Sequence, residues 1–193
     1  MKNKFLLVSV CIKRVIVIIG LLLSVATVAT AAETAAPKPG PAHQKLEIFV
    51  GEWTYQCDTK ATPLGPAAKA SGKLSGRMVL GGFFLEIRGK EKDASGAVTQ
   101  WLELDGYDPV AKRYTWTSFD DHGNTATATD TIENNTMTYQ GTGLQEGKQF
   151  KLRGFLAVAP DRMSFVDKME ISVDGGKTWQ PFFENKGTKA ASK

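Results

Sequence analysis

The sequence predicts an all-β protein, a single antiparallel up-and-down β-barrel of about ten strands preceded by a short N-terminal helix. Three observations support this prediction. After Trp53 the chain consists of short runs that alternate apolar and polar residues, turn residues separate these runs, and no later stretch has helical periodicity. Most separators are too short for a parallel crossover, so neighbouring strands should pair as antiparallel hairpins. Closing such a meander into a barrel removes its exposed edges.

The first 31 residues have the pattern of an export signal. The residues before position 15 include four basic side chains and no acidic one, Val15–Leu23 is uncharged and apolar, and Ala29–Ala31 supplies small residues for cleavage. We expect a signal peptide over residues 1–31, a periplasmic or secreted location, and no integral membrane segment after cleavage. The alternative is an uncleaved N-terminal anchor.

Removing this segment changes the charge of the chain. The full sequence has a net charge of +4, but the mature chain would hold 20 basic and 20 acidic side chains. A neutral chain gives no reason to expect a nucleic-acid partner or an anionic membrane surface. Only Cys57 would remain, so no intramolecular disulfide is possible, and its alternate spacing with Trp53 and Tyr55 predicts a buried small hydrophobe.

The mature chain divides into three parts. Residues 32–41 are rich in proline and alanine and predict a flexible linker, residues 42–187 form the barrel domain, and residues 188–193 form a disordered tail. Apolar residues at 46, 49 and 50 predict one or two helical turns at the start of the domain. The candidate strands cover residues 53–58, 69–78, 83–90, 98–105, 113–119, 125–132, 136–141, 149–158, 163–173 and 178–184.

Alternation along each strand indicates which side chains point inward. We assign the more apolar set to the interior, which places Leu102 and Leu104 inside and Glu103 outside. The same rule places these residues inside: Phe83, Leu85, Ile87, Phe150, Leu152, Met163, Phe165, Met169 and Ile171. The polar faces would then carry cross-strand charge pairs. If the faces are reversed, they would line a charged lumen and the ligand would be polar.

Three segments carry a resemblance to a known family: residues 43–53 (HQKLEIFVGEW), 76–85 (GRMVLGGFFL) and 106–118 (GYDPVAKRYTWTS). They resemble the bacterial secreted calycin-like barrels catalogued as domain of unknown function fifteen-seventy-nine. The resemblance covers nearly all of the mature chain and implies a lipocalin-like barrel, but no activity. The Gly-x-Trp opening at Gly51 and Trp53 is also similar to that of lipocalins and fatty-acid-binding proteins. We expect these two residues to plug one end of the barrel.

Residues 172–179 match the Asp-box, S-x-D-x-G-x-T-W, which recurs in sialidase propellers. In that motif the aspartate accepts hydrogen bonds from the turn amides, the glycine takes a positive φ, and the tryptophan packs under the loop. A single copy in a chain of this length predicts that Asp174, Gly176 and Trp179 stabilise a β-hairpin, and does not predict a glycosidase.

The candidate ligand-binding residues combine flat aromatic walls, adaptable methionines and a few polar anchors. They are Tyr114, Trp116, Ser118, Met137, Tyr139, Phe165 and Asp167. No catalytic residue, cofactor or metal site is expected, because the two histidines, His43 and His122, lie before the barrel and in a turn.

Three functions remain open. The first is a binding protein that holds a small, largely apolar molecule in the barrel. The second is a structural or interaction protein with a filled barrel. The third is a hydrolase or isomerase that uses buried carboxylates such as Asp167, although the sequence offers no nucleophile–base pair. A cavity of about 300 Å³ or more would favour binding over a filled barrel.

Overall fold

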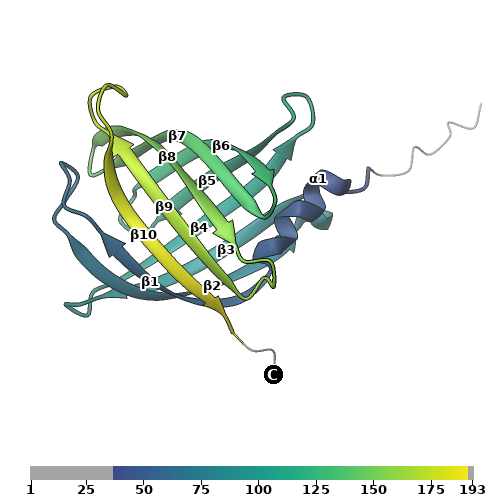
Figure 1. Ribbon diagram of the computed structural model, residues 1–193, viewed down its shortest axis with the longest axis horizontal. Coiled ribbons are helices and arrows are strands. Elements are labelled where there is room, and N and C mark those ends of the chain that lie inside the picture. Colours follow the sequence, from purple (N-terminus) through teal and green to yellow (C-terminus); the bar gives the residue numbers. More distant parts are fainter. Residues whose placement is uncertain (1–36, 191–193) are drawn as a thin grey trace, which may run out of the picture. The chain divides into compact units, whose positions relative to one another are not determined.

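The computed structural model describes residues 37–190, so the expected signal peptide and most of the expected linker lie outside the described residues. Ten strands form one closed antiparallel barrel, which confirms the predicted fold class (Figure 1). The strands are β1 Gly51–Thr59, β2 Ala68–Val79, β3 Phe84–Asp93, β4 Val98–Asp108, β5 Arg113–Asp120, β6 Thr125–Glu133, β7 Thr136–Gln145, β8 Lys148–Val158, β9 Ser164–Ser172 and β10 Gln180–Lys189. A short 3-10 turn, η2 Leu80–Gly82, connects β2 to β3.

Each strand pairs with its neighbours in the chain, and β1 closes the barrel by pairing with β10. Closure reaches into the segment that we expected to be a tail, because Thr188 pairs with Thr54 on β1 and with Ser164 on β9. The amide of Lys189 donates a hydrogen bond of 2.9 Å to the carbonyl of Met163. The barrel therefore extends to Lys189.

A short helix, α1 Pro41–Gln44, and the 3-10 turn η1 Lys45–Phe49 lie at one end of the barrel (Figure 1). Phe49 is buried there, and its carbonyl oxygen accepts a hydrogen bond of 3.1 Å from Trp53 Nε1. Trp53 itself is 1% exposed. A Cβ atom on Gly76 of β2 would collide with the same carbonyl, so only glycine lets the η1 backbone approach the wall this closely. We call α1 and η1 together the plug.

The opposite end of the barrel carries the loop between β1 and β2. Leu64 from this loop is buried in a hydrophobic cluster with Phe150 and Ile171. Lys148 Nζ donates a hydrogen bond of 3.0 Å to the carbonyl of Pro63. The loop therefore packs onto the rim of the barrel at the end that faces away from the plug.

Five glycines on the inner wall lie directly opposite aromatic residues of the next strand. The pairs are Gly72 with Tyr55, Gly89 with Trp101, Gly143 with Phe150, Gly154 with Tyr139, and Gly187 with Phe165. A Cβ atom on any of these glycines would collide with the ring that faces it. Each ring therefore lies against the backbone of the neighbouring strand and takes up less of the centre of the barrel.

The structure corrects the face assigned to β4. Leu104 is 37% exposed on the outside, whereas Asp105 is buried and Glu103 lines the lumen. Register is the physical reason. Asp105 pairs with Leu85 on β3 and with Trp116 on β5, and both of these partners point inward, so β4 must present its acidic face to the same side.

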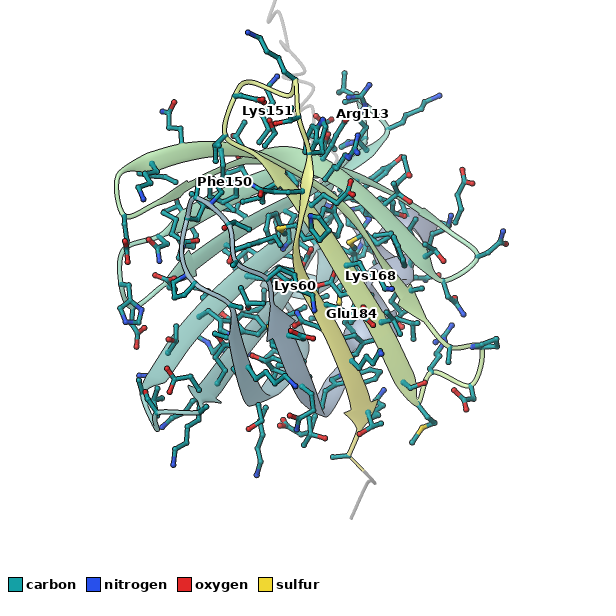
Figure 2. All side chains as sticks on the ribbon, turned by 60° about the vertical axis from the view of Figure 1, so that its left-hand side comes forward. Lys60, Arg113, Phe150, Lys151, Lys168 and Glu184 are labelled. Carbon is teal, nitrogen blue, oxygen red and sulfur yellow. The ribbon has the colours of Figure 1, made fainter. Side chains whose placement is uncertain are left out.

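The other strands with assigned faces follow the expected alternation apart from their ends. The buried inward residues include Leu85, Ile87, Phe150, Leu152, Phe165, Met169 and Ile171. Met163 was expected inside but is exposed, because it precedes the first residue of β9. Charged side chains cover the outside, including Lys60, Lys168 and Glu184 (Figure 2). Lys168 Nζ lies 3.2 Å from Glu184 Oε2.

The β9–β10 hairpin is held by a local hydrogen-bond network. Asp174 Oδ1 accepts from the amides of Lys177 and Thr178, each at 3.0 Å, and Asp174 Oδ2 accepts from Thr178 Oγ1 at 2.6 Å. Gly176 has a φ of +98° and donates its amide proton to Ser172 Oγ at 2.8 Å. These bonds stabilise the carboxylate form and hold the pKa of Asp174 well below its usual value. The guanidinium of Arg153 lies 4.2 Å from the ring centroid of Trp179, the last residue of the motif.

Candidate functional site

The lumen contains a cavity of about 330 Å³. It extends from Phe49 of the plug to Asp120 and Asn124 near the β5–β6 hairpin, at the opposite end. Six of the seven expected ligand-binding residues line it: Trp116, Ser118, Met137, Tyr139, Phe165 and Asp167. Tyr114 does not, because it lies nearer the plug, where its hydroxyl donates a hydrogen bond of 3.0 Å to the carbonyl of Ala42. Whether these residues hold a ligand stays a prediction.

Aromatic side chains form much of the wall. Trp116 on β5 and Tyr139 on β7 are stacked, with ring centroids 6.2 Å apart and an angle of 22° between the planes. Elsewhere on the wall, Trp101 Nε1 donates to the Tyr55 hydroxyl at 3.1 Å, and that hydroxyl donates to Glu91 Oε2 at 2.9 Å. The cavity therefore offers flat apolar surfaces beside ordered polar groups.

The wall is also acidic. Six carboxyl side chains line the cavity: Glu91, Glu103, Asp105, Asp120, Asp130 and Asp167. No lysine, arginine or histidine is among the lining residues of the described chain. Of these six carboxyls, only Asp167 was expected at the lumen, and Glu103 was expected outside. A usable signal existed for Asp130, because it alternates with Ala126, Ala128 and Ile132 on the apolar face of β6.

The buried carboxyl groups differ in their hydrogen bonds. Asp167 Oδ1 accepts from the Tyr139 hydroxyl at 2.7 Å, and Asp167 Oδ2 lies 3.5 Å from Asn185 Nδ2. Asp105 and Asp130 are each only 2% exposed. Within the described residues, Asp105 Oδ2 and both carboxyl oxygens of Asp130 have no hydrogen-bond partner. Such groups are costly to bury in ionised form.

Burial shifts the ionisation of all four inner carboxyls in one direction. It raises the pKa of Asp130 to about 7. It also raises the pKa of Asp167 to about 7. The hydrogen bonds from Tyr139 and Asn185 favour the ionised form and offset part of this rise. Burial raises the pKa of Glu103 to about 7, although a hydrogen bond from Trp116 favours the ionised form, and repulsion by Asp167 and Asp130 adds to the rise. Burial, followed by repulsion from Glu103 and Asp130, raises the pKa of Asp105 well above its usual value.

Carboxyls that titrate near neutral pH can accept or release a proton. The single thiol among residues 37–190 is nevertheless not an activated nucleophile. Cys57 Sγ lies 3.5 Å from Thr59 Oγ1, and burial raises the pKa of this thiol to about 11, so it stays protonated. His43 Nδ1 accepts a hydrogen bond from the Gly40 amide in the plug region, and His122 lies in the β5–β6 turn. Residues 37–190 contain no group of three metal-binding side chains arranged around one point.

None of the helices in residues 37–190 has the length and apolar character of a membrane span.

Comparisons with known proteins agree with the barrel fold. The chain is similar in structure to Rv2717c from M. tuberculosis, with 12% identity, a TM-score of 0.57, and coverage of 79% of this chain and 99% of that one. It is also similar to the S-type phycobiliprotein lyase CPES from Guillardia theta, with 10% identity, a TM-score of 0.54, and coverage of 79% and 94%. Both likenesses show the barrel fold alone.

A search of curated proteins found no match to this chain. A protein-family model described as "Protein of unknown function (DUF1579)" matches residues 38–189, which span the plug and all ten strands. The chain therefore belongs to the DUF1579 family.

Proposed function

We propose that this protein binds a small organic molecule inside its barrel. The cavity of about 330 Å³ carries the proposal, because small-molecule sites start at about 300 Å³. A barrel that served only as a structural core would fill this space with side chains. The stacked pair of Trp116 and Tyr139 provides a flat surface for the apolar part of a ligand.

The mixed lining supports binding over a purely structural role. A dry, empty cavity is normally apolar, whereas this one places Ser118, Asp130 and Asp167 beside aromatic rings. Polar groups at a few fixed positions orient a ligand and give specificity. Filling the space with a ligand would restore the packing that the open lumen lacks.

A neutral hydrophobic fluorophore, such as N-phenyl-naphthylamine, tests the proposal. Titrated into the folded protein, it should bind saturably and quench tryptophan emission. Trp116→Ala should weaken this binding, because it removes one ring of the stacked pair. Trp179→Ala is the matched control, because Trp179 lies outside the lumen against Arg153 and its loss should leave the affinity unchanged. Circular dichroism checks that both variants fold. If the wild type shows no saturable binding, the result contradicts binding of neutral molecules in the lumen and favours a structural or interaction role.

We also infer that the chain is exported to the periplasm or secreted, from the basic start and the apolar run of the first 31 residues. N-terminal sequencing of the exported protein should begin at Ala32 or within a few residues of it. A mature protein that still starts at Met1 would contradict export by cleavage.

A further inference from the structure

We propose that the lumen selects organic cations: a small molecule with a flat apolar body and one protonated amine, amidine or guanidine group, seated beside Asp105 and Asp130. This inference rests on the proposed function and names the class of ligand. Its first support is the one-sided charge of the cavity. Six carboxyl side chains line the space, and no basic side chain of the described residues offsets them.

The second support is the set of unmet acceptors. The protein supplies donors to other carboxyls of the lining. Tyr55 donates to Glu91, and Tyr139 donates to Asp167. The amides of His122 and Asn124 donate to Asp120. The described residues supply none to Asp105 Oδ2 or to either oxygen of Asp130, although both residues are 2% exposed. A buried acceptor without a donor is destabilising, and a ligand that brings N–H groups removes this cost on binding.

The third support is the position of the two carboxyls relative to the aromatic rings. Asp105 on β4 pairs directly with Trp116 on β5, and both side chains line the cavity. Trp116 is stacked against Tyr139. A ligand whose ring lies against this pair would have its charged group next to Asp105, and the aromatic faces themselves attract a cation.

Other ligand classes fit less well. An anion would meet six carboxyl groups and no cationic partner. A metal ion needs several converging ligands, and residues 37–190 contain no such group. A wholly apolar ligand would cover Asp105 and Asp130 while leaving their oxygens without donors.

A cation should compete with protons in this lumen. The other ionisable groups that face Asp130 are Tyr114 on β5, Tyr139 on β7, and Glu103 and Asp105 on β4. Without a ligand, burial favours the protonated carboxyls. A bound ammonium group favours the ionised form, so binding should release protons and should strengthen as the pH rises from about 5 to about 8.

Three probes with one ring system and different charges test the proposal: naphthylmethylamine, naphthylmethanol and naphthylacetate. Isothermal titration calorimetry should give the amine at least about tenfold higher affinity than the alcohol, the difference that one charge-assisted hydrogen bond supplies. The acetate should bind more weakly than the alcohol. The enthalpy of amine binding should vary with the ionisation enthalpy of the buffer, which reports proton release.

Asp130→Asn and Asp105→Asn should each lower the affinity for the amine by about tenfold while leaving that for the alcohol unchanged. Retained alcohol binding shows that the lumen of each variant is intact. Asp121→Asn is the control, because Asp121 is exposed in the β5–β6 turn. If the alcohol or the acetate binds as well as the amine, the lumen binds ligands but the cation proposal is wrong. If no probe binds, the proposed function fails together with this inference.

Discussion

Replacing Asp130 by asparagine should change how the stability of the protein depends on pH. Asp130 is 2% exposed and has no hydrogen-bond partner in the described residues, and burial raises its pKa from 3.8 to about 7. Between these two values the folded chain holds a proton that the unfolded chain has released. Protonated Asp130 therefore makes its full contribution to the free energy of unfolding below about pH 4, and this contribution is lost as the pH rises through about 7. The difference of about 3 pKa units between the folded and unfolded chains sets an upper limit of about 4 kcal/mol on this loss of stability.

Urea denaturation of the ligand-free proteins from about pH 4.5 to about pH 8.5 measures this effect. Near the acidic limit, asparagine resembles the protonated aspartate, so the variant and the wild type should have similar free energies of unfolding. Near the alkaline limit, Asp130→Asn should be more stable than the wild type by up to about 4 kcal/mol. The exposed control Asp121→Asn should follow the wild-type curve. A stability difference for Asp130→Asn that is constant across the pH range would refute the reasoning.

The remaining predictions concern the plug, the hairpin and the wall. Trp53→Ala should lower the free energy of unfolding by about 3–5 kcal/mol, because it removes a buried aromatic ring beside the plug, and a measured loss below about 1 kcal/mol would contradict this role. Asp174→Ala should speed hydrogen exchange of the turn amides in the β9–β10 hairpin, because these amides lose their acceptor. The wild-type protein should cleave no sialoside. Sialidase turnover that disappears in this variant would show that the motif is catalytic and not only structural. Gly187→Ala should push the Phe165 ring into the lumen, lower stability by about 1–3 kcal/mol and weaken fluorophore binding. Unchanged binding would show that the position of this ring does not limit the space for a ligand.

The fold class could be predicted from the sequence because it depends on local signals. Alternation at a period of two and frequent turn residues specify antiparallel strands, and the Gly51 to Trp53 opening indicates where they begin. Six of the seven expected lining residues could be found in the same way. Alternation gives the face of a strand but not the height of a residue along the barrel axis. Tyr114 shares the face of Trp116 yet lies closer to the plug, where it bonds to Ala42.

The acidic lumen could not be predicted by ranking the two faces of β4 by hydropathy. Leu102 and Leu104 are more apolar than Glu103 and Asp105, but the pairing of Asp105 with Leu85 and Trp116 decides which face points inward. This information is held in neighbouring strands. The four inner carboxyls also break the rule that interiors are apolar, and departures from such local rules are expected at functional sites.

The glycines opposite the aromatic rings have a consequence for the size of the lumen. Every strand of this barrel is hydrogen-bonded on both sides, so the backbone has little freedom to move outward when the interior becomes crowded. A single methyl group added at Gly89 or Gly187 would turn a ring toward the axis and reshape the lumen while every aromatic residue is retained. Exchanges between glycine and alanine at these five positions would therefore change the size of the lumen stepwise, independently of the carboxyls that line it.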